Sequence, residues 1–252
     1  MTSSLTRPPI AAFQNHLFRE NAIDLLRRLP DESVDLLFTD PPYSSGGLHS
    51  SARARPAGEK YITSSGPRYP DFSHDNKDQR SWTFWCMTWL EQALRVTKRR
   101  GYLVCFIDWR QLPSLTDAVQ GAGFIWQGIA VWDKTQGRAR PRRGGFSHQA
   151  EYMVWATREG TASTDVYLPG VFTERLAYPK RHMTEKPIGL AREVMRLVPA
   201  GSTVLDPFAG SGTFLVAARD AGHHWIGSEI EPEYYDVAKQ RMACASSLNN
   251  KT

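Results

Sequence analysis

The chain has 252 residues, of which 41% are hydrophobic and 23% are charged, and this composition is ample for a folded domain with a real core. It excludes a disordered tail and a disulfide-stapled miniprotein. The formal net charge of +5 favours a polyanionic partner.

Cysteine usage and the longest apolar run bear on the compartment. The three cysteines, Cys86, Cys105 and Cys244, are odd in number and far apart, which favours a reducing compartment over disulfides or a zinc site. Residues 1–13 lack the apolar core of a secretory signal, and the run 102–107 is much shorter than a membrane span. We therefore expect a soluble, cytoplasmic protein without a membrane segment or a metal.

Short apolar runs alternate with amphipathic segments along the whole chain. Strands are predicted at 16–18, 34–39, 102–107, 124–132, 150–155, 203–205 and 225–227. Helices are predicted at 22–29, 82–96, 112–122, 187–198, 213–221 and 232–243. This alternation predicts an α/β fold with a mostly parallel sheet.

Three segments show no clear period. Residues 44–80 are rich in Ser, Gly, Pro and charge, and are longer than an ordinary connection inside a domain. Residues 134–143 carry five cations and no acid. Residues 161–181 are irregular as well. Such segments are either solvated loops or elements that contact a partner.

The segment Asp206-Pro-Phe-Ala-Gly-Ser-Gly-Thr213 joins a predicted strand to a predicted helix. Gly210 and Gly212 allow a ligand to approach the backbone at the carboxyl edge of the sheet. Glu229, at the end of the next strand, can accept hydrogen bonds from both hydroxyls of a ribose. The pattern predicts a nucleoside-containing cofactor. Val216 replaces the third glycine of the dinucleotide fingerprint, which argues against a nicotinamide enzyme.

A second motif, Asp40-Pro-Pro-Tyr43, follows the predicted strand 34–39. The exocyclic amine of a nucleobase is a poor nucleophile because its lone pair is delocalised into the ring. The Asp40 carboxylate and the Pro41 carbonyl, each accepting one amine hydrogen, would localise that lone pair. Tyr43 offers a flat face on which an extruded base can stack. The alternative reading of this motif is a β-turn with a capping Asp.

These motifs together resemble those of the S-adenosylmethionine-dependent DNA amino-methyltransferases, which act on adenine N6 or cytosine N4. The resemblance rests on D-P-P-Y at 40–43, D-P-F-A-G-S-G-T at 206–213 and G-S-E-I-E-P-E-Y-Y at 227–235. The catalytic motif precedes the cofactor motif, as in the permuted beta type of this family. H-M-T-E-K-P at 182–187 resembles the family's cofactor-side motif, and R-E-N-A at 19–22 stands where the family usually has Gly-Asp.

The resemblance implies a Rossmann-like methyltransferase fold with a seven-stranded, mostly parallel sheet, one antiparallel strand, and helices on both faces. It implies one methyltransferase domain over 1–252, divided into a catalytic half (14–160, with a loop insertion at 44–80), a short target-recognition segment (161–183) and a cofactor-binding half (184–252). The strand 16–18 would lie beside the strand that ends at Glu229, and the two motifs would lie side by side at one edge of the sheet.

The resemblance also implies S-adenosylmethionine as cofactor and double-stranded DNA as substrate. The catalytic residues would be Asp40, Pro41, Pro42 and Tyr43. The cofactor-binding residues would be Asp206, Pro207, Phe208, Ala209, Gly210, Ser211, Gly212, Thr213, Glu229, Thr184, Lys186 and Asn21, with Lys186 or Thr184 at the methionine end. The DNA-binding residues would be Lys134, Arg138, Arg140, Arg142, Arg143, Lys60 and Arg181.

Alternatives stay open at this point. The family more often has Asp in the first motif position for adenine and Ser for cytosine, so Asp40 favours adenine N6 over cytosine N4. RNA or a protein glutamine amide could replace DNA as the substrate. The enzymes that methylate a glutamine amide have Asn in the first motif position, so Asp40 argues against the amide. A non-catalytic nucleic-acid-binding relative is disfavoured by the intact motif 40–43. Candidate partners include a second copy of the chain and a cognate restriction nuclease, and DNA binding would associate the protein with the nucleoid.

Overall fold

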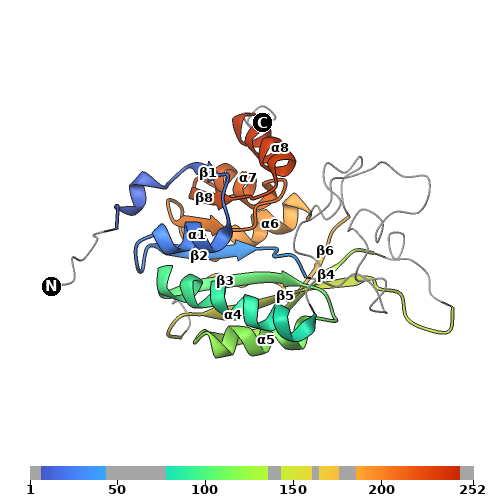
Figure 1. Cartoon of the computed structure of the whole chain (residues 1–252). Helices are drawn as coiled ribbons and strands as arrows, with labels where there is room; N and C mark the ends of the chain where they lie inside the picture. The colour runs from blue at the N-terminus through green and yellow to red at the C-terminus, as the bar shows by residue number, and fades with distance from the viewer. Residues whose placement is uncertain (1–6, 44–77, 136–142, 161–164, 176–185, 245–252) are drawn as a thin grey trace.

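The computed structural model describes residues 7–43, 78–135, 143–160, 165–175 and 186–244 (Figure 1). Its strands are β1 (His16–Phe18), β2 (Val34–Thr39), β3 (Thr97–Ile107), β4 (Ile125–Asp133), β5 (Ala150–Thr157), β6 (Val171–Thr173), β7 (Thr203–Asp206) and β8 (His224–Ser228). Its helices are η1 (Ile10–Ala12), α1 (Ala22–Arg28), α4 (Gln79–Val96), α5 (Leu112–Gly121), α6 (Ile188–Met195), α7 (Thr213–Asp220) and α8 (Pro232–Ala243). Every helix and strand expected from the sequence is present.

The strands form one sheet in the order β1-β8-β7-β2-β3-β5-β4-β6. Strand β5 runs antiparallel to both of its neighbours, and all other pairs are parallel, which confirms the expected single antiparallel strand. The expected number of seven strands is wrong, because β6 pairs with Val131–Asp133 of β4 as an eighth strand. Three residues are too few to show a period, and their pairing depends on the open edge of β4.

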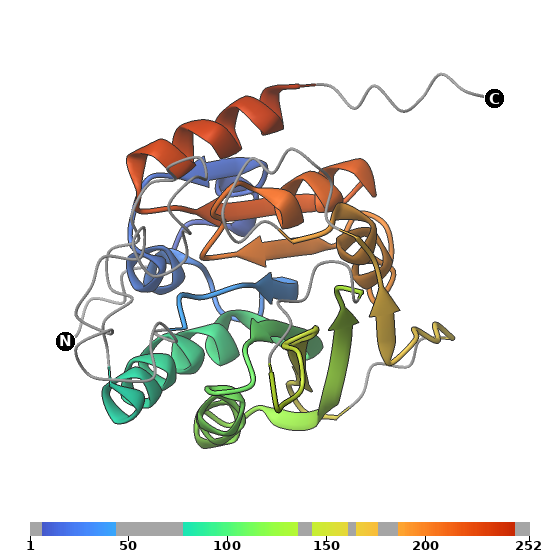
Figure 2. The same cartoon turned by 90° about the vertical axis from the view of Figure 1, so that its right-hand side faces the viewer.

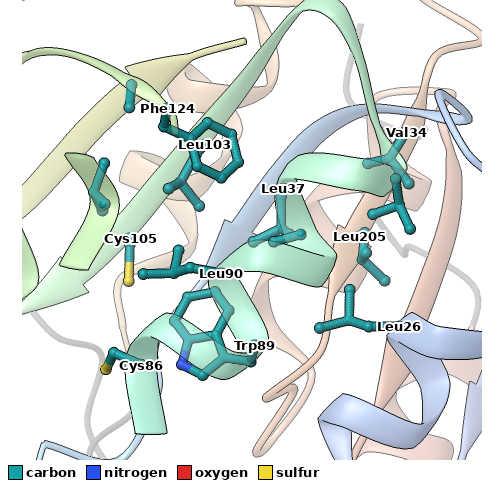
Figure 3. Close-up of a cluster of buried hydrophobic side chains, with 14 of the residues drawn as sticks. Leu26, Val34, Leu37, Cys86, Trp89, Leu90, Leu103, Cys105, Phe124 and Leu205 are labelled. Carbon is teal, nitrogen blue, oxygen red and sulfur yellow. The ribbon is translucent and has the colours of Figure 1, made fainter. Parts of the chain in front are cut away.

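Helices cover both faces of the sheet, as expected. On one face α1, α4 and α5 pack against β2, β3 and β5, and on the other α6 and α7 pack against the same sheet. In Figure 2, α4 lies on one side of the strands and α6 on the other. Figure 3 shows the first of these cores, where Trp89 and Leu90 of α4 contact the face that carries Leu37 and Leu103. Burial of such large side chains contributes roughly 1.5–3 kcal/mol each.

Strand β2 lies at the centre of the sheet and is buried on both faces. Leu37 belongs to the core under α4, whereas Leu36 and Phe38 belong to the core under α6 and α7. A strand that is buried on both sides contains a continuous apolar run, as β2 does at 36–38. The motif at 40–43 therefore begins where a rigid central strand ends.

Two expected adjacencies are confirmed by the strand register. Phe18 of β1 lies opposite Ser228 of β8, so the strand 16–18 lies beside the strand that precedes Glu229. Strand β2 pairs in parallel with β7, so Asp40 and Asp206 emerge at the same edge. Within the described ranges, none of the helices is long and apolar enough to cross a bilayer.

Candidate active site

The glycine turn between β7 and α7 has a left-handed backbone at Gly210 and Gly212. Gly212 caps α7 with a left-handed φ of 78°, and a Cβ there would lie 3.1 Å from the Ala238 Cβ of α8. The Gly210 amide donates to Glu229 Oε2 over 2.7 Å, and the Glu231 amide donates to Glu229 Oε1 over 2.8 Å. Glu229 thereby ties the end of β8 to the turn, and each of its oxygens keeps a lone pair for a further donor.

Asp206 is buried at the start of this turn. Its Oδ1 accepts hydrogen bonds from Thr39 Oγ1 over 2.7 Å and from the Phe208 amide over 3.2 Å. Its Oδ2 is buried without a hydrogen-bond partner among the described residues. Burial raises the pKa of Asp206 to about 8, against the effect of these two hydrogen bonds. A buried acceptor that lacks a partner beside an open glycine turn fits a cationic group of a bound cofactor.

Two features of the turn were missed by the sequence analysis. Arg241 of α8 donates to the Ser211 carbonyl over 2.7 Å and to Thr213 Oγ1 over 3.1 Å, which anchors the turn from the final helix. The half-buried ring of Phe208 packs edge-on against Trp85 and Trp89 of α4, with ring centroids 5.5 and 5.4 Å apart. No sequence signal linked these tryptophans to Phe208, which lies more than 100 positions further along the chain.

Asn21 has a structural role at the other end of this region. Its side chain caps α1 by accepting a hydrogen bond from the Ile23 amide over 2.8 Å. Asn is a favoured capping residue, which accounts for the residue type at this position. The end of β1 is joined to the site by the Glu229 amide, which donates to the Phe18 carbonyl. Cofactor binding by Asn21 stays a prediction.

The backbone of the motif 40–43 is held by side chains from two helical regions. Trp82 Nε1 of α4 donates to the Pro42 carbonyl over 2.7 Å, and Gln111 Nε2, at the start of α5, donates to the Tyr43 carbonyl over 3.1 Å. The Tyr43 hydroxyl donates to Asp40 Oδ1. These contacts fix the strand end from the helix side, so that the Asp40 carboxyl faces the interior of the site.

The Lys186 side chain contacts Asp40 and Glu151, and its predicted role at the methionine end of the cofactor stays a prediction. Its Nζ is 2.5 Å from Asp40 Oδ2 and 3.3 Å from Glu151 Oε2, and the side chain is only 5% exposed. Burial lowers the pKa of Lys186, but the two carboxylates outweigh it and the net direction is upward. Burial raises the pKa of Asp40 to about 6, and Lys186 limits the rise. Glu151 has no counterpart in the sequence analysis; the available signal was an acid at the start of the apolar strand 150–155.

Of the predicted DNA-binding residues, Lys134 and Arg143 lie in the described part of the chain. Lys134 Nζ pairs with Glu151 Oε1 at 3.2 Å, and Arg143 is exposed. Exposed aromatic side chains lie in the same region: Phe146 is 95% exposed, and Trp109 stacks on His148 with ring centroids 5.6 Å apart. Outside the described residues are Lys60, Arg138, Arg140, Arg142 and Arg181, and also Thr184.

The fold and the site define a class of protein: a doubly wound α/β domain whose glycine turn after β7 lies beside the motif 40–43 at the switch point of the sheet. A family model described as DNA methylase, of the N6/N4 type, matches residues 34–169 and 158–240. The chain belongs to this family of S-adenosylmethionine-dependent DNA amino-methyltransferases.

Relatives and solved structures agree with this assignment. The putative methylase YubD of Escherichia coli K12 is 28% identical over 88% of this chain and 88% of its own length. The Type II methyltransferase M2.DpnII of Streptococcus pneumoniae is 25% identical over 97% of this chain and 96% of its own length. The structure of the cytosine-N4-specific PvuII DNA methyltransferase superposes with a TM-score of 0.67 at 16% identity, over 94% of this chain and 87% of that one. This last likeness supports the fold alone.

Proposed function

We propose that this DNA methyltransferase acts on the N6 amine of adenine in double-stranded DNA. The observation that carries the proposal is the adjacency of two carboxyls, Asp40 at the end of β2 and Asp206 at the end of β7. Thr39, the residue before Asp40, donates its hydroxyl to Asp206. Asp40 accepts a hydrogen bond from the Tyr43 hydroxyl, and Asp206 accepts one from the Phe208 amide of the glycine turn. The preference for adenine comes from Asp at the first position of the motif.

The residues of the glycine turn suit the cofactor of the family. Gly210 and Gly212 allow the left-handed backbone of the turn, Glu229 offers acceptors for ribose hydroxyls, and Asp206 Oδ2 offers one for a cationic group. Phe208 and the rest of 206–213 would line the site. When bound, S-adenosylmethionine supplies the electrophilic methyl group that the target nitrogen takes up.

The chain's own residues activate the target amine. The Asp40 carboxylate and the Pro41 carbonyl each hold one amine hydrogen, and the positive charge that develops on the nitrogen is stabilised by Asp40. Tyr43 stacks on the flipped base. A thiolate route is disfavoured, because Cys86 and Cys105 are buried and burial raises the pKa of the Cys105 thiol.

DNA contacts come from the basic segment 134–143 in this proposal, with Lys60 and Arg181 from the other irregular segments. Replacing Arg140, Arg142 and Arg143 together by Ala should weaken binding to all DNA sequences. The slope of log affinity against log salt should fall by roughly 0.9 per lost phosphate contact. Fluorescence anisotropy at several salt concentrations measures both quantities. An unchanged slope would return the segment to the role of a solvated loop.

The name of M2.DpnII, a Type II methyltransferase, supports a restriction-modification role with a cognate nuclease. A homodimer, the division of the domain into halves around the segment 161–183, and a cytoplasmic, nucleoid-associated location are proposed on the family resemblance alone. Size-exclusion chromatography with light scattering tests the dimer directly.

Methyl transfer from labelled S-adenosylmethionine to unmethylated genomic DNA, followed by nucleoside analysis, tests the function. N6-methyladenine is the expected product. N4-methylcytosine would keep the mechanism and overturn the base preference; this is the second candidate, since the family model covers both amines. Cofactor binding without transfer to DNA would instead favour a non-catalytic relative or another substrate.

A further inference from the structure

Glu151 lies at the active edge of the sheet because β5 runs antiparallel to its neighbours. It is the second residue of β5 and pairs with Trp132 near the carboxyl end of β4. A parallel strand would have placed its first residues at the opposite edge. The one antiparallel strand thus delivers an acidic side chain to the edge where Asp40 lies.

The Glu151 carboxylate lies between two ammonium groups. Lys134 Nζ is 3.2 Å from its Oε1, and Lys186 Nζ is 3.3 Å from its Oε2. Lys186 in turn lies 2.5 Å from Asp40 Oδ2. The four side chains alternate in sign and sum to zero charge, which is the condition under which buried ionised groups are tolerated.

Lys186 is therefore shared between two carboxylates. Its ammonium also lies 3.3 Å from the Tyr43 hydroxyl and 5.0 Å from the centroid of the Phe106 ring, in a site where its side chain is 5% exposed. In this buried site Coulomb interactions add, so the negative charge of Glu151 offsets part of the attraction that the ammonium exerts at Asp40.

We propose that Glu151 is a positioning residue for methyl transfer: its negative charge offsets part of the effect of Lys186 on Asp40, which leaves the Asp40 carboxylate able to accept the hydrogens of the target amine. The inference rests on the proposed function of Asp40. Lys186 lowers the pKa of Asp40 and so keeps it ionised, whereas Glu151 raises that pKa and so keeps the carboxylate a stronger hydrogen-bond acceptor. Lys134 holds the other oxygen of Glu151 and fixes the carboxylate between the two cations.

The charged groups around Asp40 affect its pKa in opposite directions. The titratable groups that face Asp40 are Lys186 before α6, Glu151 on β5, Asp206 on β7, Cys105 on β3 and its own neighbour Tyr43. Burial raises the pKa of Asp40, Lys186 lowers it, and Glu151 raises it. Removal of Glu151 should therefore lower the pKa of Asp40, and removal of Lys186 should raise it further.

The test compares Glu151→Gln and Lys186→Met in the full chain. The Asp40 titration is followed by 13C-carboxyl NMR without cofactor, with the signal assigned by its loss in Asp40→Asn, and the acidic limb of kcat against pH is followed with DNA. Each variant should move both midpoints by roughly one pH unit, downward for Glu151→Gln and upward for Lys186→Met. In Glu151→Gln, kcat on the plateau should fall about tenfold, as expected when a hydrogen-bond acceptor weakens, with KM for S-adenosylmethionine unchanged.

Two further variants separate positioning from stability. Asp220→Asn breaks another partly buried ion pair, to Arg192 at 3.1 Å, and should move neither midpoint. Glu151→Asp retains the charge and should retain the wild-type midpoint, which keeps the test decisive if Glu151→Gln folds poorly.

The outcomes distinguish the role of Glu151 from the proposed methyl transfer to DNA. Midpoints unmoved in Glu151→Gln and Lys186→Met, with an active wild type, would overturn this inference and leave the proposed function intact. Wild-type protein that transfers no methyl group to DNA would overturn the proposed function and this inference with it. Opposite shifts of the two midpoints would support it, because a merely structural pair has no reason to move them in opposite directions.

Discussion

Asp40 and Asp206 occupy equivalent places at the ends of adjacent strands, yet the protein treats their charges differently. Asp40 is paired with the Lys186 ammonium and with the Tyr43 hydroxyl. Asp206 receives only the Thr39 hydroxyl and the Phe208 amide on one oxygen, and its other oxygen has no partner among the residues described. Burial raises the pKa of Asp40 to about 6 and that of Asp206 to about 8.

This difference matches the two ligands. In the proposed function the target amine is neutral, so the carboxylate that receives it must be kept ionised by the protein itself; Lys186, which lowers the pKa of Asp40, would do this. The cofactor is cationic, so in the proposed site its positive charge would neutralise the Asp206 carboxylate. A cationic side chain beside Asp206 would compete with the cofactor. We infer that an uncompensated buried carboxyl marks the cofactor side and a compensated one marks the substrate side.

The largest effect should come from Asp40→Ala. Methyl transfer should fall by at least about 100-fold, because the variant loses an acceptor that acts where charge develops. Affinity for S-adenosylmethionine should stay close to wild type, since Asp40 lies on the substrate side. Labelled transfer and isothermal titration calorimetry measure the two quantities. An Asp40→Ala variant that turns over at the wild-type rate would contradict the assignment of Asp40 to the substrate and Asp206 to the cofactor.

Asp206→Asn should show the reverse pattern. Affinity for S-adenosylmethionine should fall roughly 10- to 100-fold, the size expected for one charge-assisted hydrogen bond. The cofactor-free protein should become more stable at neutral pH, because Asn keeps an acceptor for Thr39 and removes a carboxyl that burial disfavours. Thermal unfolding should detect a rise of at least ~2 °C. A lower melting temperature with unchanged affinity would contradict the assignment of Asp206.

The pH dependence of cofactor affinity should follow Asp206. A cation binds the ionised carboxylate, so affinity should rise by up to about tenfold per pH unit below the pKa and level off above pH 8. Stability without cofactor should move in the opposite direction. The folded pKa lies above the ordinary 3.8, so this carboxyl's contribution is complete below pH 3.8 and is lost as pH rises through about 8. The gap in melting temperature between Asp206→Asn and wild type should therefore widen up to pH 8.

The smallest effect should come from Thr39→Val, which removes the hydroxyl that joins the two regions. The Thr39 hydrogen bond lowers the pKa of Asp206, so its loss should shift the affinity profile to higher pH and weaken cofactor binding about fivefold at pH 7. Thr97→Val is a matched control, because Thr97 is also fully buried and donates to the Ala93 carbonyl outside the site. Equal cofactor affinity in the two variants would argue against coupling through Thr39.

Much of the fold was predictable because local patterns survive in the final structure. The apolar runs and amphipathic stretches mark the six α-helices and seven of the eight strands of the described residues, and the expected neighbours of β1 and β2 follow from the parallel arrangement. Strand β6 was not predictable, since its three residues take their conformation from the edge of β4. The packing of Trp85 and Trp89 on Phe208 likewise depends on where α4 crosses the sheet.

The amino-acid sequence by itself determined the chemistry of the two motifs and their positions after strands, because strand ends and glycine turns are local properties of the chain. Only the tertiary structure decided which charges meet. Lys186 and Glu151 lie 146 and 111 positions beyond Asp40 in the chain, and their approach depends on the antiparallel course of β5 and on the entry to α6. Electrostatic interactions act through space, so the pairing that sets the state of Asp40 has no signature in sequence order.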